Sequence, residues 1–140
     1  MTLKLPYKKY PNKDGSFYYT AALPVNIALP QQNAPRSKRV EAFIDSGATV
    51  CQFQSGIGRA IGLDIEKGEV IETLAATGPA NIYMHDITLY IPGGPVQIKA
   101  GFSDNLPVVG LQGMMGFFEH FVVTFNPAAL RCELERIFKA

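Results

Sequence analysis

Cysteine, histidine and net charge are all scarce in this sequence. Its 140 residues include two cysteines and two histidines. Cys51 and Cys132 cannot form a disulfide framework, and neither lies at metal-ligand spacing from His85 or His120. We therefore expect neither a disulfide nor a metal site. Cys51 could instead be a nucleophile, but its apolar neighbours favour a buried, unreactive thiol.

The charges nearly balance, and long apolar runs are missing. Lys and Arg number 13 against 12 Asp and Glu, for a net charge of +1. This balance gives no reason to expect nucleic acid or an anionic membrane as a partner. No apolar run approaches membrane-spanning length, and residues 1–15 lack the uninterrupted apolar segment of a signal peptide. The sequence therefore predicts a cytoplasmic protein.

Apolar residues are plentiful and follow strand-like patterns. Hydrophobic residues make up 47% of the chain and charged residues 18%, as in a globular protein, and residues 1–140 fit a single domain. Apolar residues alternate with others over 23–29, 87–91 and 96–100, which indicates strands. The Pro-Gly-Gly at 92–94 predicts a hairpin turn between the last two.

The C-terminal part predicts one more pair of strands. The sequence Phe-Val-Val-Thr-Phe at 121–125 is a strand pattern, and Asn-Pro-Ala-Ala at 126–129 is a turn pattern. The chain then returns in a strand whose inward face carries Leu130, Cys132 and Leu134.

Helix signals are few. Residues 55–61 predict a short helix with Ser55 as its N-cap and Gly62 after its end. A second helix is expected over 113–121, where Met and Phe side chains at helical spacing predict core packing. Many short strands with one or two short helices predict an all-β, mainly antiparallel fold, a small closed barrel or sandwich.

Asp45 stands out because it ends an apolar, strand-like run over 40–44. Burying a carboxylate is costly unless it is paired or neutralised, so this position suggests function. Ser46 and Gly47 follow directly, and Asp-Ser-Gly is also an ordinary turn sequence. Neither interpretation is excluded by this motif alone.

Two separated segments together resemble the single-domain, retropepsin-like aspartic peptidases. The sequence AFIDSGAT at 42–49 is similar to that family's strand ending in a hydrophobic residue, Asp, Thr or Ser, Gly and Ala. The sequence LPVVGLQGMMGFFEHFVVTFNP at 106–127 is similar to the family's apolar-apolar-Gly segment with its following helix and strand. Residues 73–91 stand where the family has a flap hairpin. The resemblance implies a retropepsin-like acid-protease barrel and leaves an N-terminal arm of about 1–18 unassigned.

The resemblance implies an aspartic endopeptidase with Asp45 as the catalytic residue, supported by Ser46 and Gly47. It implies substrate contacts by three further residues: Ala48, Thr77 and Gly78. Peptide hydrolysis by carboxylates needs two of them around one water, and no second Asp-Ser-Gly occurs in the chain. The implied enzyme is therefore a symmetric homodimer that cleaves peptides or unfolded proteins and uses no cofactor or metal.

The sequence departs from the family at two places. Thr49 and the pair Leu111 and Gln112 stand where many members have an Asp and an Arg followed by Asp or Asn. Both sides of that ion pair are absent together, so no orphan charge is left. The loss keeps open a catalytically inactive peptide-binding or dimerisation module of the same fold, and an unrelated barrel in which Asp45 is a turn residue.

Other titratable residues are weaker candidates. Asp86 and Asp104 are alternative carboxylates, but Asp104 lies in a turn-like stretch. His85 and His120 are expected to be structural, because no convincing nucleophile stands ready for either to activate.

Overall fold

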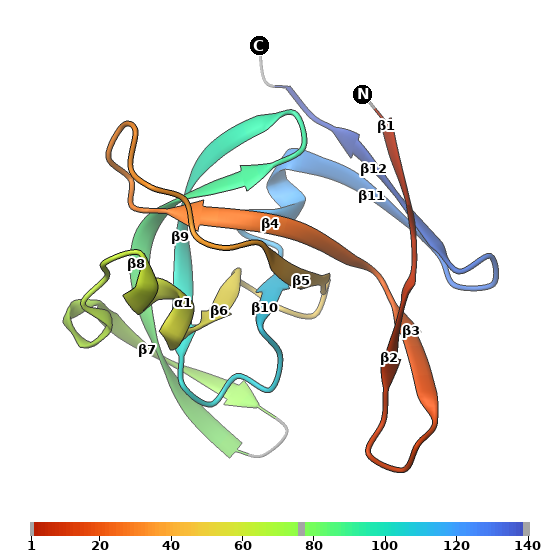
Figure 1. Cartoon of the computed structure of the whole chain (residues 1–140), viewed down its shortest axis with the longest axis horizontal. Coiled ribbons are helices and arrows are strands. Elements are labelled where there is room, and N and C mark those ends of the chain that lie inside the picture. The colour runs from red at the N-terminus through yellow and green to blue at the C-terminus, as the bar shows by residue number, and fades with distance from the viewer. Residues whose placement is uncertain (1, 76–77, 139–140) are drawn as a thin grey trace.

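A computed structural model of the chain describes residues 2–75 and 78–138 and consists mainly of strands. Figure 1 shows a barrel, a separate sheet that carries both ends of the described chain, and a hairpin that stands away from the barrel. No helix in the described ranges is long and apolar enough to cross a membrane.

The barrel is one sheet of seven strands. In spatial order these are β4 (Ala22–Ala28), β5 (Val40–Ile44), β10 (Gly110–Gln112), β6 (Gln52–Gln54), β9 (Gly94–Ser103), β8 (Gly78–Ile91) and β7 (Glu69–Ala75). Strand β4 also pairs with β8, which closes the barrel. Most pairs are antiparallel, but β5 with β10 and β6 with β9 are parallel. Within the described residues β7 pairs with β8 alone, so its other edge stays open for a further strand.

The interior of the barrel follows the predicted alternation. Leu23, Val25 and Ile27 are at most 3% exposed, because alternate residues of a strand point to one face. They pack in one cluster with Phe53 and Phe102, whose ring centroids lie 6.1 Å apart. The predicted turn at 92–94 is confirmed, since β8 and β9 pair up to Ile91 and Gly94.

The second sheet has three strands in the order β1 (Thr2–Pro6), β12 (Arg131–Arg136) and β11 (Phe121–Asn126). The predicted return strand is confirmed, with Cys132 and Leu134 fully buried. Leu130 is 43% exposed with φ 52°, so its predicted inward position is wrong. It lies in the turn before β12, where strand alternation does not apply.

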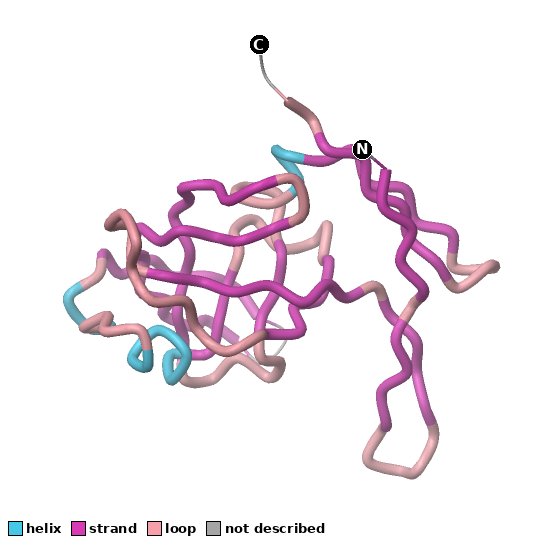
Figure 2. Tube along the Cα trace, turned by 45° about the horizontal axis from the view of Figure 1, so that its top comes forward, coloured by secondary structure: helices cyan, strands magenta, loops and turns pink. Residues whose placement is uncertain are grey.

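The N-terminal arm, to which the sequence assigned no structure, is folded. Strand β1 pairs with β12, while β2 (Lys8–Pro11) and β3 (Phe17–Thr20) pair with each other. We call residues 8–20 the β2–β3 hairpin. Figures 1 and 2 both show it reaching away from the barrel.

The first predicted helix exists as α1 (Ser55–Ala60), but its predicted cap is wrong. The N-cap position is Gln54, because β6 continues into the helix without a break, and Ser55 is already helical and buried. Gly62 has φ 104°, which suits the residue after a helix end. A short 3-10 helix, η1 (Ile65–Lys67), follows.

The second predicted helix is absent as such. Only η2 (Phe118–His120), a 3-10 helix, forms there. The N–H groups of Met114 and Met115 donate to the carbonyls of Ala48 and Thr49, and Gly116 has φ 100°, a left-handed backbone conformation that an α-helix does not contain. The core prediction is right for Phe117, which is fully buried and stacks on Phe121, and wrong for Met114, which is 47% exposed.

Candidate active site

Asp45 is the first residue after β5, at the end of a strand whose inward side chains are buried. Its backbone N–H donates to the carbonyl of Gln112 at 3.0 Å, and the N–H of Ile44 donates to Ala21 at 3.0 Å. The base of the turn is therefore fixed to strands on both sides. The Asp45 side chain itself is only half-buried.

The turn that follows holds the Asp45 carboxylate by a local hydrogen bond. Gly47 donates its N–H to Asp45 Oδ1 at 2.9 Å, and Ala48 donates to the Asp45 carbonyl at 3.1 Å. A Cβ at Gly47 would lie 3.2 Å from Oδ1, a tight contact, so glycine suits this approach. Ser46 is exposed and Ala48 is buried. The geometry of a turn thus orients a carboxylate toward the outside of the barrel.

A second segment, β10 and the residues after it, is hydrogen-bonded to the turn. Strand β10 runs parallel to β5, and beyond it Met114 and Met115 bond to the carbonyls of Ala48 and Thr49 at 2.8 and 2.9 Å. Gly113 makes the approach possible, since a Cβ there would lie 2.4 Å from the Val50 carbonyl oxygen. The two segments that carry the sequence resemblance are thus hydrogen-bonded to each other.

Gln112, one of the positions that differ from the resembled family, makes an uncharged contact. Gln112 is fully buried, and its Oε1 accepts a hydrogen bond from the thiol of Cys51 at 3.3 Å. The N–H of Gly113 donates to the Cys51 sulfur at 3.4 Å. Leu111 is half-buried and Thr49 is exposed. This Cys51–Gln112 contact was not foreseen from the sequence, because each residue alone looks like ordinary core.

The predicted burial of the Cys51 thiol is confirmed, since Cys51 is fully buried. Burial raises the pKa of its thiol to about 12, although the hydrogen bond from Gly113 acts in the opposite direction. The reactive thiolate is therefore scarce at neutral pH. Burial also raises the pKa of Cys132, with a smaller contribution from Glu133.

The expected flap is an antiparallel hairpin of β7 and β8. Its register runs from Glu69 opposite Met84 to Ala75 opposite Gly78. Gly78, a predicted substrate-binding residue, begins β8, whereas Thr77 lies outside the described residues. Pro79 is part of β8 and faces Leu74 in the register.

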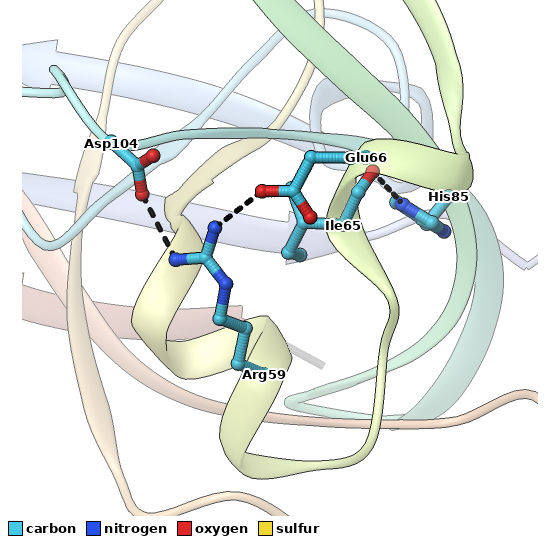
Figure 3. A network of polar contacts seen from close by, with 5 residues as sticks. All are labelled: Arg59, Ile65, Glu66, His85 and Asp104. Atoms are coloured by element: carbon cyan, nitrogen blue, oxygen red, sulfur yellow. Dashed lines mark hydrogen bonds and ion pairs between the residues drawn. The ribbon is translucent and has the colours of Figure 1, made fainter.

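The remaining titratable candidates have structural surroundings (Figure 3). Asp104 and Glu66 bind the guanidinium of Arg59 at 3.1 and 2.7 Å, and these contacts, first that with Asp104, raise the pKa of Arg59. His85 contacts the carbonyl oxygen of Ile65 through Nε2 at 2.8 Å. Asp86 is exposed and lies 4.0 Å from Lys99.

His120 ends η2 and lines a cleft of about 350 Å³ together with Glu119, Val50 and Met115. A larger cleft of about 600 Å³ lies between α1 and residues 35–38, and Asp45 is not among its lining residues. Within the ranges the structure describes, no three His, Cys, Asp or Glu side chains gather as metal ligands would.

Solved structures with a similar architecture were found. A retropepsin-like aspartic protease from Rickettsia conorii matches with a TM-score of 0.64 over 96% of this chain and 98% of that one, at 16% identity. The chain has the retropepsin-like aspartic protease fold. The EIAV protease complexed with the inhibitor HBY-793 matches this retropepsin-like chain over 67% of its length and 81% of that protease, with a TM-score of 0.51 and 13% identity. No protein-family model and no curated protein matches the sequence.

Proposed function

We propose that this chain is an aspartic endopeptidase that acts as a symmetric homodimer, with one Asp45 carboxylate from each copy. The observation that carries the proposal is the placement of Asp45 at the end of a core strand, oriented by Gly47 and tied to Gln112, in a chain with the retropepsin-like fold. One chain supplies one such carboxylate, so the second copy completes the site.

The chemistry follows from two carboxylates around one water. Two like charges this close cannot both ionise readily, so the pair holds one proton between them. The ionised carboxylate takes a proton from the water, whose oxygen attacks the peptide carbonyl carbon. The protonated carboxyl donates to the carbonyl oxygen, and collapse of the tetrahedral intermediate breaks the C–N bond as the nitrogen gains a proton.

We also propose roles for the supporting residues. Ser46, exposed on the turn, is proposed to hydrogen-bond across the two-fold axis, and Gly47 keeps the backbone close to the Asp45 carboxylate. Ala48, Thr77 and Gly78 are proposed to contact the substrate. An extended peptide or unfolded protein would pair with the β7–β8 hairpin as an added strand.

Neither position of the missing ion pair carries a charge here: Thr49 is exposed and Leu111 is half-buried. Gln112 has no charge to compensate, and its side chain bonds the buried Cys51 thiol instead. The Asp45 turn is held in addition by four backbone hydrogen bonds, donated by Ile44, Asp45, Met114 and Met115. These bonds support a rigid turn without the family's Asp and Arg.

Cleavage of an unfolded protein mixture across pH 3 to 8, with wild type and Asp45→Asn in parallel, tests the proposal. Peptides that only the wild type produces, identified by mass, would establish an Asp45-dependent endopeptidase. Asp45→Asn is nearly isosteric, and we expect it to abolish cleavage while the fold and the dimer persist. Equal product patterns from both proteins at every pH would overturn the proposal and favour the peptide-binding module.

A further inference from the structure

The β2–β3 hairpin has no role in the proposed chemistry. It leaves the body of the protein on the side where β5 ends (Figure 1). An isolated two-stranded hairpin is at best marginally stable in water, so something else must help to hold it. The alternation of its strands gives it two different faces.

The inner face is anchored to the barrel. Tyr10 stacks on Tyr18 with ring centroids 5.7 Å apart and contacts Phe43 of β5 at 5.0 Å. Lys8 forms an ion pair with Glu41, also on β5. These contacts fix the root of the hairpin on the outer surface of the barrel.

The outer face carries solvent-exposed aromatic side chains. Phe17 is 55% exposed and Tyr19 is 47% exposed. Phe17 faces Pro11 and Tyr19 faces Lys9 in the register, and the Lys9 ammonium lies 4.0 Å from the centroid of the Phe17 ring. Aromatic rings of this size dominate the energetics of protein interfaces when they are buried.

The contact between Tyr10 and Phe43 lies close to the proposed catalytic residue. Phe43, on which Tyr10 packs, is the last residue but one of β5, and Asp45 directly follows the end of that strand. A second copy placed over Asp45 therefore approaches the side of the barrel from which the hairpin extends.

We propose that the outer face of the β2–β3 hairpin, formed by Lys9, Pro11, Phe17 and Tyr19, binds a second copy of this chain. Under two-fold symmetry each hairpin reaches over the other copy, so four aromatic side chains are buried per dimer. The proposal rests on the proposed homodimer and adds the surface that holds it together.

The test is the dimer dissociation constant, measured by analytical ultracentrifugation over a concentration series. We expect Phe17→Ser combined with Tyr19→Ser to raise it by about a hundredfold or more, as loss of several interface aromatics does. Val122→Ser is the matched control, because Val122 is 52% exposed on β11, outside both the β2–β3 hairpin and the proposed site, and it should leave the constant unchanged. Circular dichroism melting verifies that each variant is folded.

A second measurement uses an otherwise unchanged chain. Tyr19 is replaced by the photo-crosslinker p-benzoylphenylalanine, and ¹⁴N- and ¹⁵N-labelled copies are mixed before irradiation. Cross-linked peptides that combine the two labels support the proposal, whereas linkage only within one copy overturns it. A wild type that stays monomeric, or a double variant with an unchanged dissociation constant, also overturns it.

The cleavage assay on the same samples keeps the two proposals separate. Asp45-dependent cleavage together with an unchanged dissociation constant would remove only the hairpin surface. A dimer that depends on Phe17 and Tyr19 but cleaves nothing would keep the hairpin surface and remove the peptidase.

Discussion

At the scale of single residues, Gly113 lies where the segment after β10 closely approaches the backbone that follows Asp45. A Cβ there would meet the Val50 carbonyl carbon and oxygen at 2.5 and 2.4 Å and the Ala48 carbonyl oxygen at 2.9 Å. All three are backbone atoms, so the two segments must move apart. We expect Gly113→Ala to lower the free energy of unfolding by about 2 kcal/mol or more, measured by urea denaturation, and to reduce cleavage.

Gly56 is the control for this substitution. A Cβ on Gly56 would have no neighbour within 4 Å, and the residue lies inside α1. Since alanine is the better helix former by about 1 kcal/mol, Gly56→Ala should leave the protein equally or more stable. A Gly113→Ala variant as stable and active as Gly56→Ala would contradict the close approach of β10 to the Asp45 turn.

Cys51 gives a prediction for alkaline pH. Its pKa is about 12 in the folded chain and near 8.5 in an unfolded one, because burial disfavours the thiolate. Its contribution to stability is therefore complete below about pH 8 and is lost progressively as pH rises toward 12. Between pH 9 and 10.5 the unfolding free energy of the wild type should fall more steeply than that of Cys51→Ala, by up to about 1.4 kcal/mol per pH unit.

Cys132→Ala provides the comparison for Cys51, since the pKa of Cys132 is also raised but the group is less buried. Its pH slope should lie between those of the wild type and Cys51→Ala. Parallel slopes for all three proteins would show that neither thiol changes its protonation on unfolding.

At the scale of elements, a hydrogen bond from His85 on β8 to Ile65 connects the base of the β7–β8 hairpin to η1. The His85 ring contacts the Ile65 carbonyl through Nε2, which must carry the hydrogen because a carbonyl only accepts. His85→Leu removes this hydrogen bond and leaves the Gly68 N–H as the donor to the Ile65 carbonyl, at a cost of about 0.5–1.5 kcal/mol. We expect faster amide hydrogen exchange in residues 65–75, measured by mass spectrometry, and an unchanged rate in β11 and β12.

The sequence predicts the elements best where one local rule governs them. Alternation identifies β4, β8 and β9, and the glycines of the 92–94 turn, with φ 89° and 123° at Gly93 and Gly94, mark the hairpin. The segment after β10 misleads because its apolar spacing is helical, while Met114 and Met115 form hydrogen bonds with residues far away in the sequence. Local patterns carry no information about such distant partners.

The candidate site also has one part that the sequence predicts and one part that it does not. Asp45 could be found from the sequence, since a carboxylate at the end of an apolar strand conflicts with core burial. The contact of Cys51 with Gln112 joins positions 61 residues apart, and the antiparallel pairing of β6 with β10, which sets Leu111 opposite Gln52, brings them together. Neither residue conflicts with its local pattern, so nothing in the sequence marks the pair.

At the scale of the whole molecule, the proposed site needs two chains, and mixing experiments can count them. A pair of one wild-type chain and one Asp45→Asn chain has a single carboxylate and should not cleave. If subunits exchange freely, activity per wild-type chain should fall to about half in an equal mixture and to about one tenth at ninefold excess of the variant, by random pairing.

The mixture is assayed with substrate in large excess, so that binding of substrate by inactive dimers does not reduce the rate. A ninefold excess of Asp45→Asn that also carries Phe17→Ser and Tyr19→Ser is the matched control. If the hairpin holds the dimer, a mixed pair with this triple variant keeps only one of its two intact hairpin contacts, so the triple variant should reduce wild-type activity less than the single variant does. Undiminished activity with the single variant would instead mean that one chain suffices, and the second carboxylate would have to come from elsewhere in the same chain.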